Sequence, residues 1–428
     1  MKKLILSFLL LFPLLSIVSN AETKFDIQKT IDSLGKNGGT VEIPSGTYNI
    51  SKSIVITKPN VILKGQGNST VLVGAKSDTS IIVVKGSEST ATTILNDLKP
   101  GGGLDYQNPV LQVADSRNLR VGDQVKIVQG TSKKFSYNYI RSIDGNNVTL
   151  VDNITEKYEA AKKLKLIKVS LLPDVTIQDM SFTSLAKVSG EPQHAAIRGM
   201  YTDRLKIENV NFTKVTATPI FIDQSLTPSI TGNSFIQSGR VEKGDYAIGS
   251  QANFAAKIMD NTITQSGPIN ITNNQYTKVI NNYANDTGPT NNDAITVDGG
   301  IENLISYNTI LRPNCYGIWL LGGAERNTIS NNQFIAGITS GVYLTDAKNN
   351  IIENNVARYN SGNGIFLDFG ADRNMVRNNS VYENESRGIL VHGINNKLLG
   401  NISEDNAMEQ FRIATGNSLD NVPTVLEE

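Results

Sequence analysis

Apolar and polar positions recur along residues 170–419 in a repeat of 21 to 28 residues. Each repeat opens with a segment of the form I-x-x-N-x-(F/I/V) and closes, after a polar stretch, with one of the form G-I-x-(L/V). Within both segments apolar residues alternate with polar ones at a period of two, which is typical of short β-strands. A repeat of this length with Asn- and Gly-rich turns predicts an all-β fold, a parallel β-solenoid.

One position of the opening segment is Asn in eight consecutive repeats: Asn233, Asn261, Asn282, Asn308, Asn332, Asn355, Asn379 and Asn401. Neighbouring coils of a solenoid lie about 4.8 Å apart, so these side chains are expected to lie one above the other. The Asn side chain both donates and accepts hydrogen bonds, and Asn tolerates the left-handed backbone of a sharp bend. The pattern therefore predicts a ladder of Asn side chains that bond from coil to coil.

Other parts of the chain depart from the repeat. Residues 1–21 combine two Lys, an apolar run and the small-residue ending S-N-A, which predicts a signal peptide and a secreted or periplasmic protein. Residues 22–97 begin with the amphipathic stretch FDIQKTIDSL, which predicts a capping helix ahead of the first coils. Residues 98–169 contain alternating runs around a D-G-N-N turn, which predicts a small β-rich insertion. Residues 420–428 are expected to form a C-terminal tail.

The composition excludes several classes of protein. The chain of 428 residues carries 40 Lys and Arg against 40 Asp and Glu, a balance that argues against nucleic acid or a membrane surface as partner. It has one Cys and two His, His194 and His392, so an intrachain disulfide, a zinc finger and a His-rich metal site are excluded. Beyond the predicted signal peptide there is no long apolar run, so no membrane contact is expected after cleavage.

The entry motif GGTVEIPSGTY at residue 38 and coils such as NNIIENNVARYNSGNGIFLDFG at residue 349 resemble the pectate-lyase-like right-handed parallel β-helix superfamily. The C-terminal coils are similar to those of mannuronan C5-epimerases and of NosD-type periplasmic repeat proteins. The resemblance extends over nearly all of the mature chain. It implies a right-handed solenoid that binds an acidic, uronate-containing polysaccharide along one sheet.

Alternation predicts which residues this sheet presents outward, because the Ile and Leu of each closing segment point inward. The first outward column comprises Arg198, Phe221, Gly249, Asn270, Thr296, Trp319, Tyr343, Phe366 and Leu390. The second comprises Met200, Asp223, Ser250, Thr272, Asp298, Leu321, Thr345, Asp368 and His392. Exposed aromatic rings can stack on sugar rings, so the predicted substrate-binding residues are Phe221, Tyr246, Trp319, Tyr343 and Phe366. The alternative is that a loop or the C-terminal tail covers these rings.

Long loops near residues 185, 237 and 285 flank the early coils, and such loops on a rigid scaffold often carry a site. The predicted catalytic residues in this region are His194, Arg198, Asp223, Arg240, Lys243, Asp245 and Asp298. Removal of the proton beside a uronate carboxylate needs a base, an acid and a group that neutralises the carboxylate. His194, Lys243 or Tyr246 suit the first two roles, and Arg198 or Arg240 suits the third. Oxygens near Asp293 and Asp298 also suit Ca²⁺, whereas no other metal or cofactor is expected.

The chemistry itself stays open at the level of the sequence. The Asp-Pro-His-(Asp/Glu) motif of mannuronan epimerases is absent, and the coils GSQAN and ITNNQ lack the Lys and Arg of chondroitinase B-type lyases. Hydrolysis needs two carboxylates about 5 to 9.5 Å apart, and Asp223 and Asp298 are expected three coils, about 14 Å, apart. Asp368 and His392 are column neighbours about 4.8 Å apart and could form a small acid–base pair, but chance placement on a polar face is the favoured interpretation. On the family resemblance we favour a lyase or C5-epimerase. A polygalacturonase-like hydrolase and a non-catalytic NosD-like binder remain alternatives.

Overall fold

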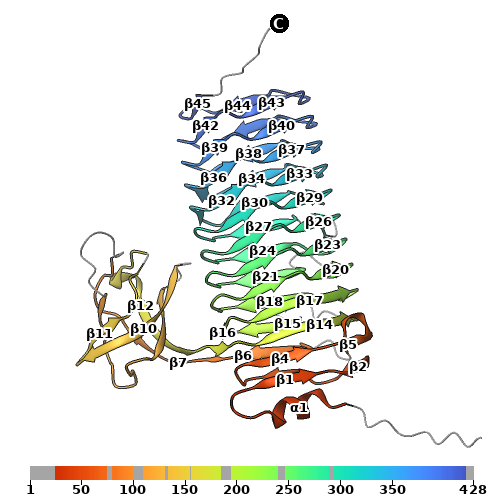
Figure 1. Ribbon diagram of the computed structural model, residues 1–428. Coiled ribbons are helices and arrows are strands. Elements are labelled where there is room, and N and C mark those ends of the chain that lie inside the picture. Colours follow the sequence, from red (N-terminus) through yellow and green to blue (C-terminus); the bar gives the residue numbers. More distant parts are fainter. Residues whose placement is uncertain are drawn as a thin grey trace, which may run out of the picture.

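The computed structural model describes residues 25–74, 80–99, 109–130, 134–154, 156–184, 194–239, 246–288 and 293–420. Parallel coils stack along one axis, with the single α-helix of the described chain at one end and β45 (Ser418–Asp420) at the other (Figure 1). No helix in the described ranges is long and apolar enough to cross a membrane. The predicted signal peptide, residues 1–21, lies outside the described residues.

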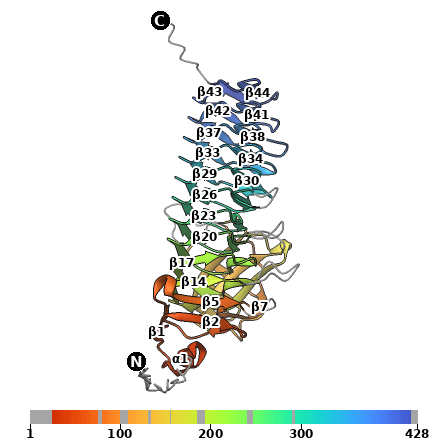
Figure 2. The same ribbon diagram turned by 90° about the vertical axis from the view of Figure 1, so that its right-hand side faces the viewer.

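The solenoid wall consists of two large parallel sheets. The 12-stranded sheet takes one strand from each coil: β3 (Ile54–Ile56), β6 (Ile82–Lys85), β15 (Ala195–Met200), β18 (Thr218–Asp223), β21 (Ile248–Gln251), β24 (Ile269–Thr272), β27 (Ile295–Asp298), β30 (Ile318–Leu321), β34 (Val342–Leu344), β38 (Ile365–Leu367), β41 (Ile389–Val391) and β44 (Phe411–Ile413). The 23-stranded sheet holds two such stacks, which join through the long strands β14 (Thr176–Thr183) and β17 (Lys206–Thr213). The prediction of a parallel β-solenoid is confirmed, and Figure 2 shows the narrow side of the stack.

Inward-pointing residues of every coil form one continuous apolar core, mostly of Ile, Val and Leu. Aromatic side chains stack from coil to coil where space allows. The rings of Phe182 and Phe212 lie 5.2 Å apart and those of Phe212 and Phe235 lie 5.0 Å apart. Because each layer buries its apolar residues against the next one, the coils stabilise each other and the outward face is left free to vary.

The predicted Asn ladder is confirmed. Asn332 Nδ2 donates to Asn355 Oδ1 at 3.0 Å and to the carbonyl oxygen of Ile305 at 2.9 Å, and the same pattern repeats from Asn233 to Asn379. A second ladder, from Asn303 to Asn417, and a shorter third one, from Asn360 to Asn406, were not predicted.

The left-handed backbone expected at each ladder Asn lies instead one residue earlier, as at Asn331 with φ 58° and Asn354 with φ 56°. The bend is therefore made by the preceding residue, and the ladder Asn holds that bend by hydrogen bonds.

The capping helix α1 (Ile27–Ser33) follows the predicted stretch, with Ile27 and Ile31 buried against the first coil. The insertion forms a six-stranded sheet in the order β7 (Ser87–Thr93), β12 (Leu164–Ser170), β9 (Gln124–Gln129), β10 (Phe135–Asp144), β11 (Asn147–Leu150) and β8 (Val110–Gln112). The predicted hairpin at D-G-N-N joins β10 to β11. This sheet starts at Ser87, earlier than residue 98, and it lies beside the early coils (Figure 1).

Candidate functional site

The strand register aligns the first outward column as alternation predicts. Phe221 pairs with Gly249, Thr296 pairs with Trp319, Trp319 pairs with Tyr343, and Tyr343 pairs with Phe366. The second column differs at one coil, where Asp223 pairs with Gln251 rather than with Ser250, whose side chain is buried. Ser250 binds the amides of Asn253 and Asn274 instead, so it belongs to the interior of the coil.

Four aromatic rings in the middle and late coils lie in contact along this face, and we call them the aromatic strip: Tyr316, Trp319, Tyr343 and Phe366. Tyr316 stacks on Tyr343 with 4.2 Å between ring centroids, and Trp319 lies 6.0 Å from Tyr343. Phe366 continues the row 5.2 Å from Tyr343. All four side chains are half-buried, so each presents part of its ring to solvent. A row of contacting rings on consecutive coils is a ready surface for the apolar faces of sugar rings.

A hydrogen-bonded polar group lies directly beside the aromatic strip. Asp368 Oδ2 accepts from the hydroxyl of Tyr343 at 2.8 Å, while Asp368 Oδ1 lies 3.1 Å from His392 Nδ1. The partial burial of Asp368 acts to raise its pKa, but the hydrogen bonds from His392, Tyr343 and the backbone N–H of Phe369 outweigh it and hold the pKa below its usual value. The carboxylate is therefore a fixed anion, and the column neighbours Asp368 and His392 form a real pair.

A second polar group lies where the insertion meets the early coils, and we call it the inner cluster: Lys126, Tyr137, Arg198, Asp223 and Gln224. Lys126 Nζ donates to Gln224 Oε1 at 3.1 Å and lies 4.7 Å from the centroid of the Phe135 ring. The Tyr137 hydroxyl donates to the carbonyl oxygen of Gln224 at 2.8 Å. These contacts join residues of the insertion to a solenoid turn about a hundred positions away, so the inner cluster docks the insertion.

Burial shifts the pKa of two charged residues of the inner cluster, Lys126 and Asp223. It lowers the pKa of Lys126 to about 8, against the attraction of Glu88 and Asp223. It also raises the pKa of Asp223 to about 6, against the positive charges of Arg198 and Lys126. Asp223 is 7% exposed, and its Oδ1 is bonded to none of the described residues. In both cases desolvation outweighs charge pairing, so the folded protein disfavours the charged forms.

The outward position of Phe221 differs from the expectation of a solvent-facing ring. Phe221 is only 3% exposed, because it packs over Gly249 together with Tyr246. A Cβ atom at Gly249 would lie 2.5 Å from Phe221 Cδ2 and 3.0 Å from Tyr246 Cδ2. The missing side chain of Gly249 thus makes the space that the Phe221 ring fills, and Phe221 does not extend the aromatic strip.

The remaining predicted site residues are dispersed. Arg240, Lys243 and Asp245 lie outside the described residues. His194 is buried, and neither of its ring nitrogens bonds to a described residue. Asp298 is three strands away from Asp223 in the second column, as the spacing predicts.

Asp293, whose oxygens suit Ca²⁺ together with those near Asp298, accepts from Thr296 Oγ1 at 3.1 Å and from the backbone N–H of Tyr316 at 3.2 Å. It therefore supports the base of the aromatic strip. In the described part of the chain, no group of three or more His, Cys, Asp and Glu side chains could hold a metal ion.

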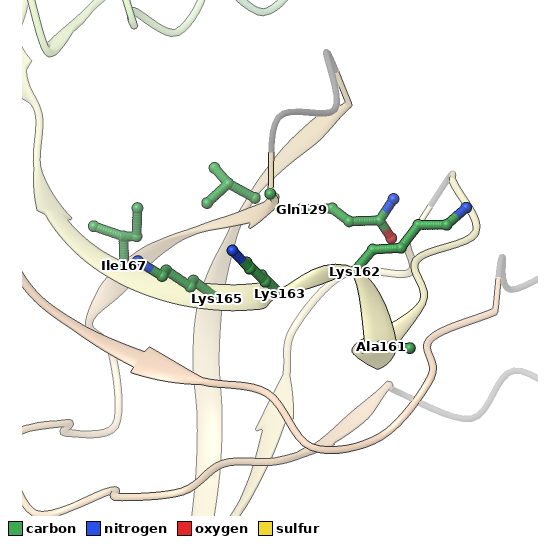
Figure 3. A pocket seen from close by; sticks show the side chains of 8 residues that line it. Gln129, Ala161, Lys162, Lys163, Lys165 and Ile167 are labelled. Atoms are coloured by element: carbon green, nitrogen blue, oxygen red, sulfur yellow. The ribbon is translucent and has the colours of Figure 1, made fainter.

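A pocket of about 800 Å³ lies in the insertion rather than on the solenoid. Three Lys side chains line it, together with apolar atoms of Val128 and Ile167 (Figure 3). Lys162 is paired with Glu159 at 3.0 Å, whereas Lys163 and Lys165 are exposed. Its lining shares no residue with the aromatic strip or the inner cluster, although Ile167 pairs in register with Lys126 of the inner cluster.

Sequence reasoning missed Tyr316, Lys126 and Tyr137. Tyr316 precedes its strand and follows no column, and the insertion carries no repeat from which a contact with a particular coil could be inferred. The sequence of the insertion therefore gives no indication that Lys126 contacts Gln224. In contrast, the pairing of Asp368 with His392 had a signal, because both stand in one outward column.

The fold has many relatives among solved structures. The catalytic domain of a GH87 alpha-1,3-glucanase in complex with nigerose aligns with a TM-score of 0.58 and 14% identity over 94% of this chain and 67% of that chain. The Gp54 tailspike of Acinetobacter baumannii bacteriophage AP22, in complex with capsular saccharide, aligns with a TM-score of 0.56 and 12% identity over 89% of this chain and 68% of that chain. The A-module of the Azotobacter vinelandii mannuronan C-5 epimerase AlgE6 aligns with a TM-score of 0.52 and 14% identity over 93% of this chain and 94% of that chain. At these identities the similarity is one of fold.

Among curated proteins, none matches this chain significantly. The sequence profile described as "Right handed beta helix region" matches residues 195–344 and 304–424. The two matches together run without a gap from residue 195 to residue 424, which is more than half of the 428 residues. Together with the parallel coils, this match identifies the chain as a member of the right-handed β-helix family.

Proposed function

We propose that this protein binds an acidic polysaccharide along the outward face of its 12-stranded sheet. The observation that carries the proposal is the aromatic strip, in which Tyr316, Trp319, Tyr343 and Phe366 form a continuous row of contacting rings. Such a row parallel to the solenoid axis suits an extended chain of sugars, because each ring can meet a different sugar of the chain.

The relatives support a carbohydrate ligand. Three structures with the same fold are a glucanase in complex with nigerose, a tailspike in complex with a capsular saccharide and a mannuronan C-5 epimerase. A cationic side chain at the late end of the face, Arg412, suits a ligand that carries carboxylates. We further propose that the protein is exported and loses residues 1–21, which N-terminal sequencing of the mature protein would test.

For the chemistry, we propose proton transfer beside a uronate carboxylate, as in a lyase or a C5-epimerase. A hydrolase would need two carboxylates that face each other across the bound sugar. One carboxylate beside the aromatic strip, Asp368, bonds a histidine and a tyrosine rather than a second carboxylate. This arrangement favours acid–base chemistry by an imidazole over hydrolysis by paired carboxylates.

Binding is tested by comparing the wild type with Trp319→Ala on a panel of uronate polysaccharides and a neutral glucan, by isothermal titration calorimetry. Loss of the largest ring of the strip is expected to weaken binding of the uronate polymer about tenfold, or about 1.4 kcal/mol. Tyr307→Ala is the matched control, because Tyr307 is an exposed aromatic residue in a turn at the 23-stranded sheet. Equal affinity of all three proteins, or preference for the neutral glucan, would contradict the proposal.

A further inference from the structure

The late end of the outward face holds a built acid–base pair. Asp368 follows β38 and His392 follows β41, two adjacent strands of the sheet. Asp368 Oδ1 also accepts from the backbone N–H of Phe369 at 2.9 Å, and Oδ2 accepts from Tyr343. Two donors besides His392 therefore hold the carboxylate in place, one at each oxygen.

This fixed carboxylate orients the imidazole. An ionised carboxylate only accepts hydrogen bonds, so the 3.1 Å contact requires His392 Nδ1 to carry the proton. The neutral ring then has its lone pair on Nε2, which bonds to none of the described residues. The His392 side chain is 37% exposed, so Nε2 can meet a ligand. A carboxylate that binds Nδ1–H also stabilises the imidazolium that forms when Nε2 takes a proton.

Aromatic rings flank the imidazole. The ring centroids of Phe366 and Phe369 each lie 5.1 Å from the centroid of the His392 ring, and Phe366 meets that ring edge-on. Phe369 is 74% exposed, although it is a large apolar side chain. Phe369 thus adds an exposed ring beside His392 at the end of the aromatic strip, and a sugar chain that lies on Tyr343 and Phe366 would reach the imidazole.

A cation lies one strand further along the same face. Arg412 of β44 pairs in register with Leu390 of β41, two residues before His392. Its guanidinium is more than half exposed and makes a 3.7 Å contact with Glu409, which is itself held by Arg387 at 2.7 Å. At 3.7 Å this exposed pair is weak, and a guanidinium has five donors, so Arg412 has capacity for a further carboxylate.

We propose that His392, oriented by Asp368, is the group that removes the C5 proton of a uronate residue, and that Arg412 binds the carboxylate of that residue. This inference rests on the proposed function and names the reacting residues of the same face. The C5–H bond breaks, its proton goes to Nε2, and its electron pair delocalises into the carboxylate beside the Arg412 guanidinium. In the elimination, that pair forms the C4=C5 double bond, the C4–O bond breaks, and the imidazolium returns the proton to the leaving oxygen.

The test uses His392→Asn, because the Asn amide can still donate to Asp368 as Nδ1 does but offers nothing in place of Nε2. Binding of the full chain to the uronate polymer is measured by calorimetry. Turnover is measured by the ultraviolet absorbance of the unsaturated product and by deuterium incorporation at C5 in heavy water. We expect unchanged affinity and at least about a 100-fold loss of turnover.

The outcomes separate the two proposals. If the wild type binds the polymer but neither eliminates nor exchanges the C5 proton, or if His392→Asn keeps full turnover, the assignment of His392 is wrong and the binding function stands. If the wild type binds no uronate polymer, both proposals fail. Arg412→Gln is expected to raise KM about tenfold for the uronate polymer, whereas Arg373→Gln, an exposed turn arginine bonded to Asn349, should leave KM unchanged.

Discussion

The outward face of the 12-stranded sheet has two ends that share one register but differ in what covers them. At β18 the outward residues Phe221 and Asp223 are almost fully buried. From β30 to β38 the residues of the same column, Trp319, Tyr343 and Phe366, present their rings to solvent. Strand alternation decides only whether a side chain leaves the core. The neighbouring loops and the insertion decide whether it reaches a ligand.

The two ends also differ in how they hold charge. At the inner cluster, burial shifts the pKa of Lys126 and of Asp223 toward the neutral forms. At the late end, hydrogen bonds to Asp368 lower its pKa and so favour its charged form, and the His392 side chain remains partly exposed. The inner charges therefore cost stability and dock the insertion, whereas the late pair stays partly exposed to solvent. This contrast leads us to place the reaction at the late end.

The substitution Lys126→Met is expected to have the largest effect, a change in how the free energy of unfolding depends on pH. The pKa of Lys126 is about 8 in the folded protein and about 10.5 when unfolded, so the wild type gains stability as pH rises between these values, by up to about 3 kcal/mol. Met has no charge to lose, so the variant should lack this rise. At pH 7 it should be at least as stable as the wild type.

Urea unfolding of Lys126→Met from pH 7 to pH 10.5 measures this effect, with Lys165→Met, an exposed lysine of the same sheet, as control. A variant that loses several kcal/mol at pH 7 would show instead that the buried ammonium is a favourable partner of Asp223. In that case the inner cluster would be a stabilising ion pair rather than a costly one.

Asp223→Asn has the next largest effect. Because the pKa of Asp223 is raised to about 6 in the folded protein, the folded state holds its proton where the unfolded state has lost it. Wild-type stability is therefore expected to fall by about 2 kcal/mol as pH rises from about 4 to about 6. The Asn variant should show a smaller fall over that range in urea unfolding.

The same variant tests the placement of the reaction. Binding of the uronate polymer and its turnover should be unchanged in Asp223→Asn, because the side chain lies under the insertion. A loss of turnover with intact binding would move the reaction to the inner cluster. His392 would then be an accessory residue of the binding face.

Much of this architecture could be predicted because the repeat converts spacing along the chain into position in space. Asn332 and Asn355 are 23 residues apart and bond directly, since each occupies the same place in successive coils. The same reasoning predicted that Asp368 and His392 lie on adjacent coils and that Asp223 and Asp298 lie three coils apart. Where the repeat holds, one column of residues predicts one line of contacts.

The rest could not be predicted because it depends on contacts that break the repeat. Lys126 reaches Gln224 from an insertion without periodicity, and Tyr316 joins the aromatic strip from a turn before its strand. Phe221 is outward by alternation but buried, because Gly249 on the next strand leaves room for its ring. Burial of an outward residue depends on its neighbours in space, and a single column does not show them.

The smallest effect we predict is a gain, from Thr296→Trp. Thr296 is the neighbour of Trp319 on the early side, so a new ring there would lengthen the aromatic strip by one coil toward the inner cluster. The variant loses the hydrogen bond from Thr296 Oγ1 to Asp293, which offsets part of the gain. We expect binding of the uronate polymer to tighten about threefold in calorimetry, or about 0.6 kcal/mol.

Gly249→Ala is the counterpart of this variant at the buried end. Its Cβ would meet the rings of Phe221 and Tyr246, so it should lower stability without changing affinity. If Thr296→Trp instead weakens binding, the sugar chain does not cross β27 along the first column. The ligand would then be confined to the late coils, between Trp319 and His392, and the early half of the face would serve only to hold the insertion.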